Sequence, residues 1–184
     1  MPVPEGWDAE AALGACPVVE WEGHLWRMHK RRYRAEDPGG ARLVSGRYNR
    51  ALDRFSEGET FPALYLASAP EICLGEIYRH ITPELLPSLN DFRLSELSVS
   101  LQEVADCRDH SALSLTPAHL VHDTDYQATQ YLGVAANSRG LEGLLVPSAT
   151  RLGDNLILFT QNLLDGSRIA LVSSHDPRLY VRRD

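Results

Sequence analysis

Residues 140–159 read GLEGLLVPSATRLGDNLILF, in which two short apolar runs flank a polar turn. The first run, 143–146, is typical of a buried strand, and it ends at Pro147-Ser148. A turn through 151–154 then leads into the second run at 155–159. The two runs follow each other with no helix between them, which differs from the pattern of a parallel βαβ unit.

Short strands and a few helices also alternate irregularly along the rest of the chain. A helix is predicted over 126–138, with Asp125 as its cap and Gly140 as its left-handed stop. The capping box Ser68-Ala69-Pro70-Glu71 predicts a second helix that runs to about Ile81. Further strands are expected at 18–28, 63–67, 92–104, 169–172 and 179–181, and short helices at 8–15 and near Thr116-Pro117. This mixture favours a compact α+β fold over a doubly wound sheet.

Nothing in the sequence divides it into parts. We find no internal repeat, low-complexity tract or Gly/Ser linker, so residues 1–184 are predicted to form a single domain. Residues 29–61 are basic, polar and rich in glycine, and they predict a long loop. Ordered loops of this length in a compact domain are usually functional.

Composition and charge narrow the class of protein. The chain has 43% hydrophobic and 23% charged residues, which excludes a disordered or fibrous protein. Its formal net charge of -7 argues against a nucleic-acid or anionic-membrane partner. No secretory signal or membrane-spanning stretch is recognised. The three cysteines are far apart in the sequence and fit reduced packing residues, so we expect a cytoplasmic protein; they are Cys16, Cys73 and Cys107.

Several common catalytic motifs are missing from the sequence. It has neither a dinucleotide fingerprint nor a P-loop. Ser148 lacks the Gly-x-Ser-x-Gly context of a hydrolase nucleophile. His119 and His122 have a spacing that suits a metal, but no third ligand is near them in sequence. We therefore predict no metal site.

Polar residues at the edges of apolar elements are the remaining candidates. At 100° per residue, Glu76 projects between Ile72 and Cys73 on the apolar arc of its predicted helix. A carboxylate on an apolar face is costly unless a partner or a substrate uses it. Taken singly, such residues are most often structural, and spacing alone leaves both interpretations open. The candidates are Arg27, Arg47, Tyr65, Glu76 and Ser148.

At these residues the chain resembles the RES family, the toxins of RES–Xre toxin–antitoxin pairs. The family is named for an Arg, a Glu and a Ser, which match Arg27, Glu76 and Ser148. The resemblance runs from about Val19 to Asn162. Its motifs are Leu25-Trp26-Arg27, Gly46-Arg47-Tyr48-Asn49, Ala63-Leu64-Tyr65-Leu66-Ala67-Ser68, Leu74-Gly75-Glu76, Tyr126-Gln127-Ala128-Thr129-Gln130, 140–149 and 155–159.

The chain departs from the family pattern at two places. Family members often have arginine and glycine directly after the Pro-Ser-Ala motif, where this chain has Thr150-Arg151-Leu152-Gly153. Tyr48 replaces a commoner tryptophan. The first departure lies in the loop that follows Ser148.

The resemblance implies a fold similar to ADP-ribosyltransferases and diphtheria-type toxins. It implies NAD as substrate, with nicotinamide expelled and ADP-ribose transferred to phosphate or water, so that the cell loses NAD and stops growing. Two alternatives stay open: a mono-ADP-ribosyltransferase that modifies a protein, and a non-catalytic binding module. The resemblance also implies a cognate Xre-like antitoxin that blocks the active site in a hetero-oligomer.

The resemblance and the chemistry of NAD cleavage together suggest roles for the residues. Glu76 is expected to bond a ribose hydroxyl and to stabilise the developing positive charge. Arg27 and Arg47 would clamp the pyrophosphate or an incoming phosphate. Tyr65 is expected to stack on the nicotinamide or ribose, and Ser148 to bond the nicotinamide-side ribose. Asn155 is assigned either to holding its loop or to touching the substrate.

Overall fold

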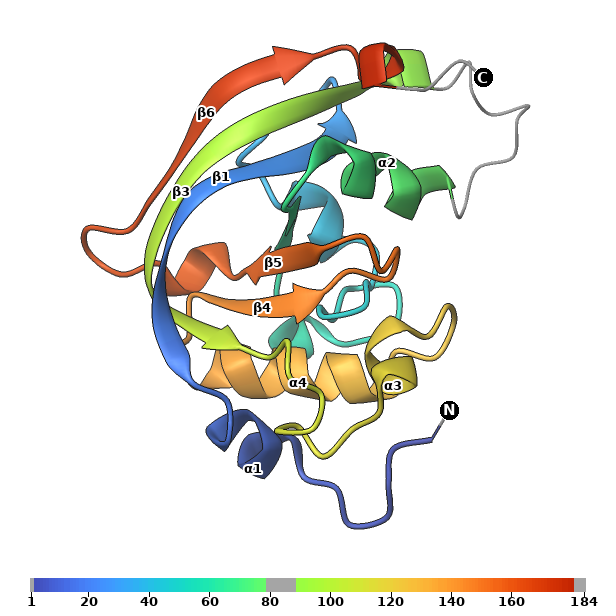
Figure 1. The fold of residues 1–184 in the computed structure, drawn as a ribbon, viewed down its shortest axis with the longest axis vertical. Coiled ribbons are helices and arrows are strands. Elements are labelled where there is room, and N and C mark those ends of the chain that lie inside the picture. Colours follow the sequence, from blue (N-terminus) through green and yellow to red (C-terminus); the bar gives the residue numbers. More distant parts are fainter. Residues whose placement is uncertain (1, 79–88, 181–184) are drawn as a thin grey trace.

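Two long strands with alternating apolar residues form the main part of the sheet. They are β1 (Val18–Lys30) and β3 (Phe92–Asp106), which pair antiparallel along almost their whole length. Figure 1 shows that both are strongly curved, with β6 (Arg168–His175) following the outer edge of β3. The computed structural model describes residues 2–78 and 89–180. Residues 18–28 belong to the single continuous strand β1, although the alternating pattern in the sequence also allowed two strands.

Three short strands close the curved sheet into a ring. β2 (Leu64–Ala67) meets β1 through Trp26 opposite Ala67, and its other edge pairs antiparallel with β5 (Asp154–Leu158). β4 (Gly143–Pro147) joins β5 to the end of β3, antiparallel to the first and parallel to the second. Since β1 and β3 also pair with each other, these strands form a small barrel.

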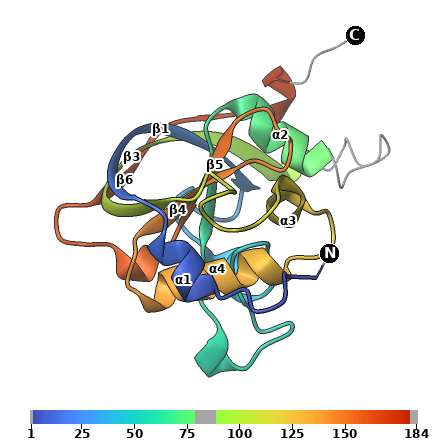
Figure 2. The same ribbon diagram turned by 60° about the horizontal axis from the view of Figure 1, so that its bottom comes forward.

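Apolar side chains fill the barrel and pack against its outer face. The interior cluster is made mainly of leucines and valines from opposite walls, including Leu25, Leu66, Leu97 and Leu156. A second cluster lies between the barrel and two helices, α1 (Ala9–Gly14) and α4 (Gln127–Ser138). Figure 2 shows these two helices side by side. The fold is thus a compact α+β domain, as the sequence predicts.

Two further helices lie at the edges of the barrel. α2 (Pro70–Tyr78) packs Ile72 and Cys73 against Ala67 and Leu94, which confirms the apolar arc predicted for it. α3 (Pro117–Val121) begins at the Thr116-Pro117 pair predicted to start a helical turn. In Figure 1, α2 lies between the end of β1 and the β5–β4 pair. No helix among the described residues is long and apolar enough to span a bilayer.

Most predicted elements are present, with two differences. The N-cap of α4 is Tyr126 and not Asp125 as predicted, because the helix begins one residue later, and Asp125 Oδ1 accepts from Gln127 N instead. The other difference lies near the C-terminus. Residues 177–180 form a 3-10 helix where 179–181 were expected to be a strand; residue 181 lies outside the described residues. Pro177 fixes φ near its helical value, and the Asp176 carboxylate accepts from Arg178 N, which together favour a turn. The predicted end of α2 at Ile81 also lies outside the described residues. The long loop is confirmed, with 3-10 helices at Gly39–Arg42 and Glu57–Glu59.

Glu142 is a buried carboxylate that joins three parts of the fold. Glu142 is 0% exposed to solvent. Its Oε2 accepts hydrogen bonds from Gln102 N at 2.6 Å and from Glu103 N at 2.9 Å. Oε1 accepts from Leu164 N at 3.0 Å. Burial by itself raises the pKa of Glu142, but hydrogen bonds from the Ser167 hydroxyl and these backbone amides outweigh it and hold the pKa below its usual value.

Replacing Glu142 with alanine is expected to destabilise the fold by more than about 2 kcal/mol, because buried backbone N–H groups lose their acceptor. A pKa lowered on folding stabilises the protein above the unfolded-state value, and this contribution is lost as pH falls through the folded-state value. Melting temperatures measured from pH 7 down to pH 3 should therefore fall less steeply for Glu142→Ala than for the wild type. Parallel curves would contradict this role.

Candidate active site

Glu76 on α2 and Ser148 after β4 meet in a hydrogen bond. The Ser148 hydroxyl donates to Glu76 Oε1 at 2.7 Å, and Ala149 N donates to the same oxygen at 3.1 Å. Asn155 Nδ2, on β5, adds a third contact to Oε1 at 3.3 Å. The carboxylate that the sequence placed on an apolar helix face is thus half-buried and held by donors from the 148–155 segment.

Two glycines allow α2 and the 148–153 turn to approach each other closely. A Cβ at Gly75 would lie 2.9 Å from Thr150 Cγ2. A Cβ at Gly153 would lie 2.7 Å from Ile72 Cδ1 and 2.8 Å from Ser68 Oγ. Both positions are tighter than side chains normally allow, so the absence of side chains there brings Glu76 within reach of Ser148.

The turn itself is stabilised by local hydrogen bonds. Ser148 N donates to Gly153 O at 2.9 Å, and Arg151 N donates to Ser148 O at 2.9 Å. Thr150 N donates to Ser148 Oγ at 3.1 Å, a local contact typical of serine in turns. Arg151 has a φ of 60°, in the left-handed region that a side chain disfavours, so the surrounding contacts hold the turn against this cost.

Tyr65 belongs to a separate network with the 46–49 loop. Its hydroxyl donates to Asn49 Oδ1 at 2.8 Å and accepts from Tyr48 N at 2.9 Å, and burial raises the pKa of Tyr65. The Asn49 side chain also accepts from Gly46 N and donates to Ala41 O. Asn49 is 1% exposed and organises this loop, a role that we did not predict although the residue lies in a quoted motif.

Arg47 is held against the end of α3 and the segment that follows it. Its Nη1 donates to Leu120 O at 3.2 Å and to His122 O at 2.6 Å. The guanidinium also lies over the Tyr126 ring, 4.6 Å from the centroid. One edge and one face of this cation are therefore occupied by the protein itself.

The Arg27 side chain projects from β1 on the face opposite to α2. Trp26 and Met28 pack in the cluster under α2, whereas Leu25 points into the barrel, and strand residues alternate between faces. Arg27 Nη1 donates to Ala35 O at 2.5 Å and to Asp37 O at 2.9 Å. Burial lowers the pKa of Arg27 to about 10, against the opposing effects of neighbouring acidic groups.

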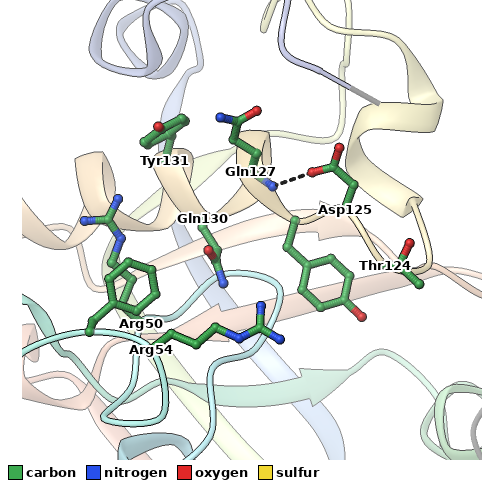
Figure 3. Close-up of a pocket in the computed structure, with 9 residues that line it drawn as sticks. Arg50, Arg54, Thr124, Asp125, Gln127, Gln130 and Tyr131 are labelled. Atoms are coloured by element: carbon green, nitrogen blue, oxygen red, sulfur yellow. Dashed lines mark hydrogen bonds between the residues drawn. The ribbon is translucent and has the colours of Figure 1, made fainter.

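A separate cavity of about 410 Å³ lies at the start of α4. Figure 3 shows Arg50 and Arg54 on one side of it and Gln127, Gln130 and Tyr131 on the helix side. None of the residues that line it belongs to the Glu76 cluster. Tyr126, whose ring lies under Arg47, also lines it, whereas Arg47 itself does not.

The two histidines considered as metal ligands make structural contacts. His119 Nδ1 accepts from Thr116 N at 3.1 Å, so Nε2 is the donor to Pro2 O at 3.2 Å. His122 Nδ1 accepts from Asp125 N at 3.0 Å. Within residues 2–78 and 89–180, no group of three or more His, Cys, Asp or Glu side chains is arranged to hold a metal ion.

A comparison with known protein families identifies the family of this chain. The RES domain model matches residues 24–181, a range that contains every candidate site residue named above. The chain belongs to the RES domain family. The matched range extends past the end of the predicted resemblance and begins after α1.

Relatives of this RES domain are known by activity and by structure. The chain is 27% identical over 180 residues to the NAD(+) phosphorylase MbcT of Mycobacterium tuberculosis, covering 91% of this chain and 90% of the relative. The MbcT of Mycobacterium bovis matches to the same extent. A crystal structure of the M. tuberculosis MbcT–MbcA toxin–antitoxin complex is similar in fold, with a TM-score of 0.79, 26% identity and 94% coverage of both chains.

In the structure of this RES domain, only some of the predicted site residues contact one another. Ser148 and Asn155 form hydrogen bonds with Glu76. Tyr65, Arg47 and Arg27 form hydrogen bonds with other parts of the protein. Sequence reasoning did not assign a role to Thr150 or Gly75. The two-residue spacing of Thr150 from Ser148 is the local signal that could have indicated a hydroxyl contact.

Proposed function

We propose that this RES domain protein cleaves NAD, expels nicotinamide and transfers ADP-ribose to inorganic phosphate, or to water, as the toxin of a toxin–antitoxin pair. The observation that carries the proposal is the Glu76 carboxylate, which three donors from the described residues hold through Oε1. The activity named for the similar MbcT proteins supports the same reaction.

The chemistry of the leaving group suits a single carboxylate. Nicotinamide leaves NAD as a neutral molecule from a cationic pyridinium, so its departure requires no general acid. This differs from ordinary glycoside hydrolysis, which uses a carboxylate pair. Glu76 would bond a ribose hydroxyl and stabilise the oxocarbenium-like centre as its positive charge develops.

The other candidates are assigned to the remaining parts of NAD. Arg27 and Arg47 contact the pyrophosphate or the incoming phosphate; a guanidinium carries five N–H donors, and the carbonyl contacts of both residues use Nη1. Tyr65 presents its ring to the nicotinamide or ribose while its hydroxyl holds the loop. Ser148 and Asn155 meet the nicotinamide-side ribose from their places beside Glu76.

We also propose the cellular setting that follows from this activity. A cytoplasmic enzyme that depletes NAD must be restrained, and a cognate Xre-like antitoxin that blocks the site in a hetero-oligomer is the expected partner. The net charge of -7 agrees with the absence of a nucleic-acid or membrane partner from this scheme. The fold is proposed to be related to that of ADP-ribosyltransferases, with NAD as substrate and no metal.

The first measurement is product analysis by phosphorus NMR, with purified protein and NAD in the presence and absence of inorganic phosphate. A new ADP-ribose species that requires phosphate establishes phosphorolysis. ADP-ribose in both tubes establishes hydrolysis. Intact NAD in both tubes contradicts transfer to these small acceptors, and labelled NAD in cell lysate then tests the protein-modifying alternative. Normal growth on expression without an antitoxin would point to a binding module.

A further inference from the structure

Thr150 extends the contact between Ser148 and Glu76 into a chain of hydrogen bonds. Thr150 Oγ1 lies 2.9 Å from Ser148 Oγ, and Leu152 N donates to Thr150 Oγ1 at 3.3 Å. Thr150 N donates to Ser148 Oγ at 3.1 Å. The chain therefore runs from Leu152 N through two hydroxyl groups to the Glu76 carboxylate.

The direction of each hydroxyl follows from proton counting. An ionised carboxylate only accepts, so the single hydroxyl proton of Ser148 points to Glu76 Oε1. The contact between the two hydroxyls must then use the proton of Thr150. This leaves Thr150 Oγ1 free to accept from Leu152 N, which the geometry provides. In this arrangement Ser148 Oγ donates once and accepts twice.

We propose that Thr150 is a positioning residue for NAD cleavage, which fixes the Ser148 hydroxyl toward Glu76 and so sets the orientation of the carboxylate. This inference rests on the function proposed above. Without the Thr150 hydroxyl, Ser148 Oγ loses one of the two donors that hold it, so the position of the Ser148 hydroxyl beside Glu76 is less tightly fixed. Among the described residues, the other donors to Oε1 are Ala149 N and Asn155 Nδ2, at 3.1 and 3.3 Å, so the Ser148 hydroxyl makes the shortest of these contacts.

The two ends of the Thr150 side chain have separable tasks. The Cγ2 methyl occupies the space that a side chain at Gly75 would need, only 2.9 Å from the position of such a Cβ. The hydroxyl makes the contacts with Ser148 and Leu152. Thr150→Val keeps the methyl and the branched shape but loses the hydroxyl. Thr150→Ser keeps the hydroxyl and loses the methyl.

These two variants test the proposal by steady-state kinetics with NAD and phosphate. Thr150→Val is expected to lower kcat about tenfold with little change in KM, because a misplaced carboxylate weakens the transition state more than substrate binding. Thr150→Ser should keep most of the wild-type kcat. An unchanged kcat in Thr150→Val, or an equal loss in both variants, would overturn the proposal.

A second readout separates this inference from the proposed function. Carbon-13 NMR of the Glu76 carboxyl carbon should show a changed chemical shift in Thr150→Val and a nearly native one in Thr150→Ser, whether or not NAD is turned over. Identical shifts in the wild type and both variants would refute the positioning role. A wild-type protein that leaves NAD intact refutes the proposed function instead.

Discussion

Glu76→Gln is expected to reduce kcat/KM for NAD at least about 100-fold while the protein stays folded. The three donors that the described residues supply to Glu76 converge on Oε1, so the amide oxygen of glutamine can take that position and keep these hydrogen bonds. The negative charge is lost, and with it the stabilisation of positive charge at the ribose. Preorganised groups of this kind typically contribute factors of about 10²–10³.

Glu71→Gln is the matched control for this substitution. Glu71 lies in the first turn of the same helix and is exposed, so its replacement removes an equal charge outside the cluster. NAD consumption followed by phosphorus NMR should be near wild type for Glu71→Gln and nearly abolished for Glu76→Gln, with closely similar melting temperatures. Glu76→Gln activity within twofold of the wild type would remove the carboxylate charge from the mechanism.

Local features of the sequence were sufficient to predict the position of Glu76. The Ser-Ala-Pro-Glu start of α2 indicated the helix, and the apolar arc of Ile72 and Cys73 placed the carboxylate on a packed face. These signals act within a few residues, through backbone restriction and side-chain periodicity. The short strands on either side of the 148–153 turn were predicted for the same reason.

Contacts between distant segments were beyond such reasoning. The barrel closes because β1 pairs with β3, whose residues are about seventy positions apart, and no local pattern specifies that pairing. The environment of Arg27 follows from it, since closure decides which face of β1 is interior. The direction in which the Thr150 hydroxyl donates its proton likewise depends on a distant contact. It requires α2 to approach the 148–153 turn closely, and Gly75, which is far from Thr150 in the sequence, permits that approach.

Gly133→Ala is expected to destabilise the fold by about 3 kcal/mol or more, which lowers the melting temperature of a chain of this size by roughly 6–12 °C. Gly133 lies on the buried face of α4, where a Cβ would be 1.9 Å from the carbonyl oxygen of Tyr48. That oxygen belongs to the backbone and cannot rotate away as a side chain can. The helix or the 46–49 loop must therefore move.

Either movement strains the contacts that hold this loop against α4. Gln130 Nε2 donates to Gly46 O at 2.9 Å, and Arg47 lies over the Tyr126 ring, so Gly133→Ala should also lower NAD turnover through Arg47 and Tyr65.

The control is Gly14→Ala at the end of α1, where the nearest atom to a new Cβ is Arg139 Nη1 at 3.9 Å. That variant should melt at or slightly above the wild-type temperature, because alanine is the better helix former. Thermal melts of both variants beside the wild type decide the matter: if Gly133→Ala melts like Gly14→Ala, the close approach of α4 to Tyr48 does not constrain the fold.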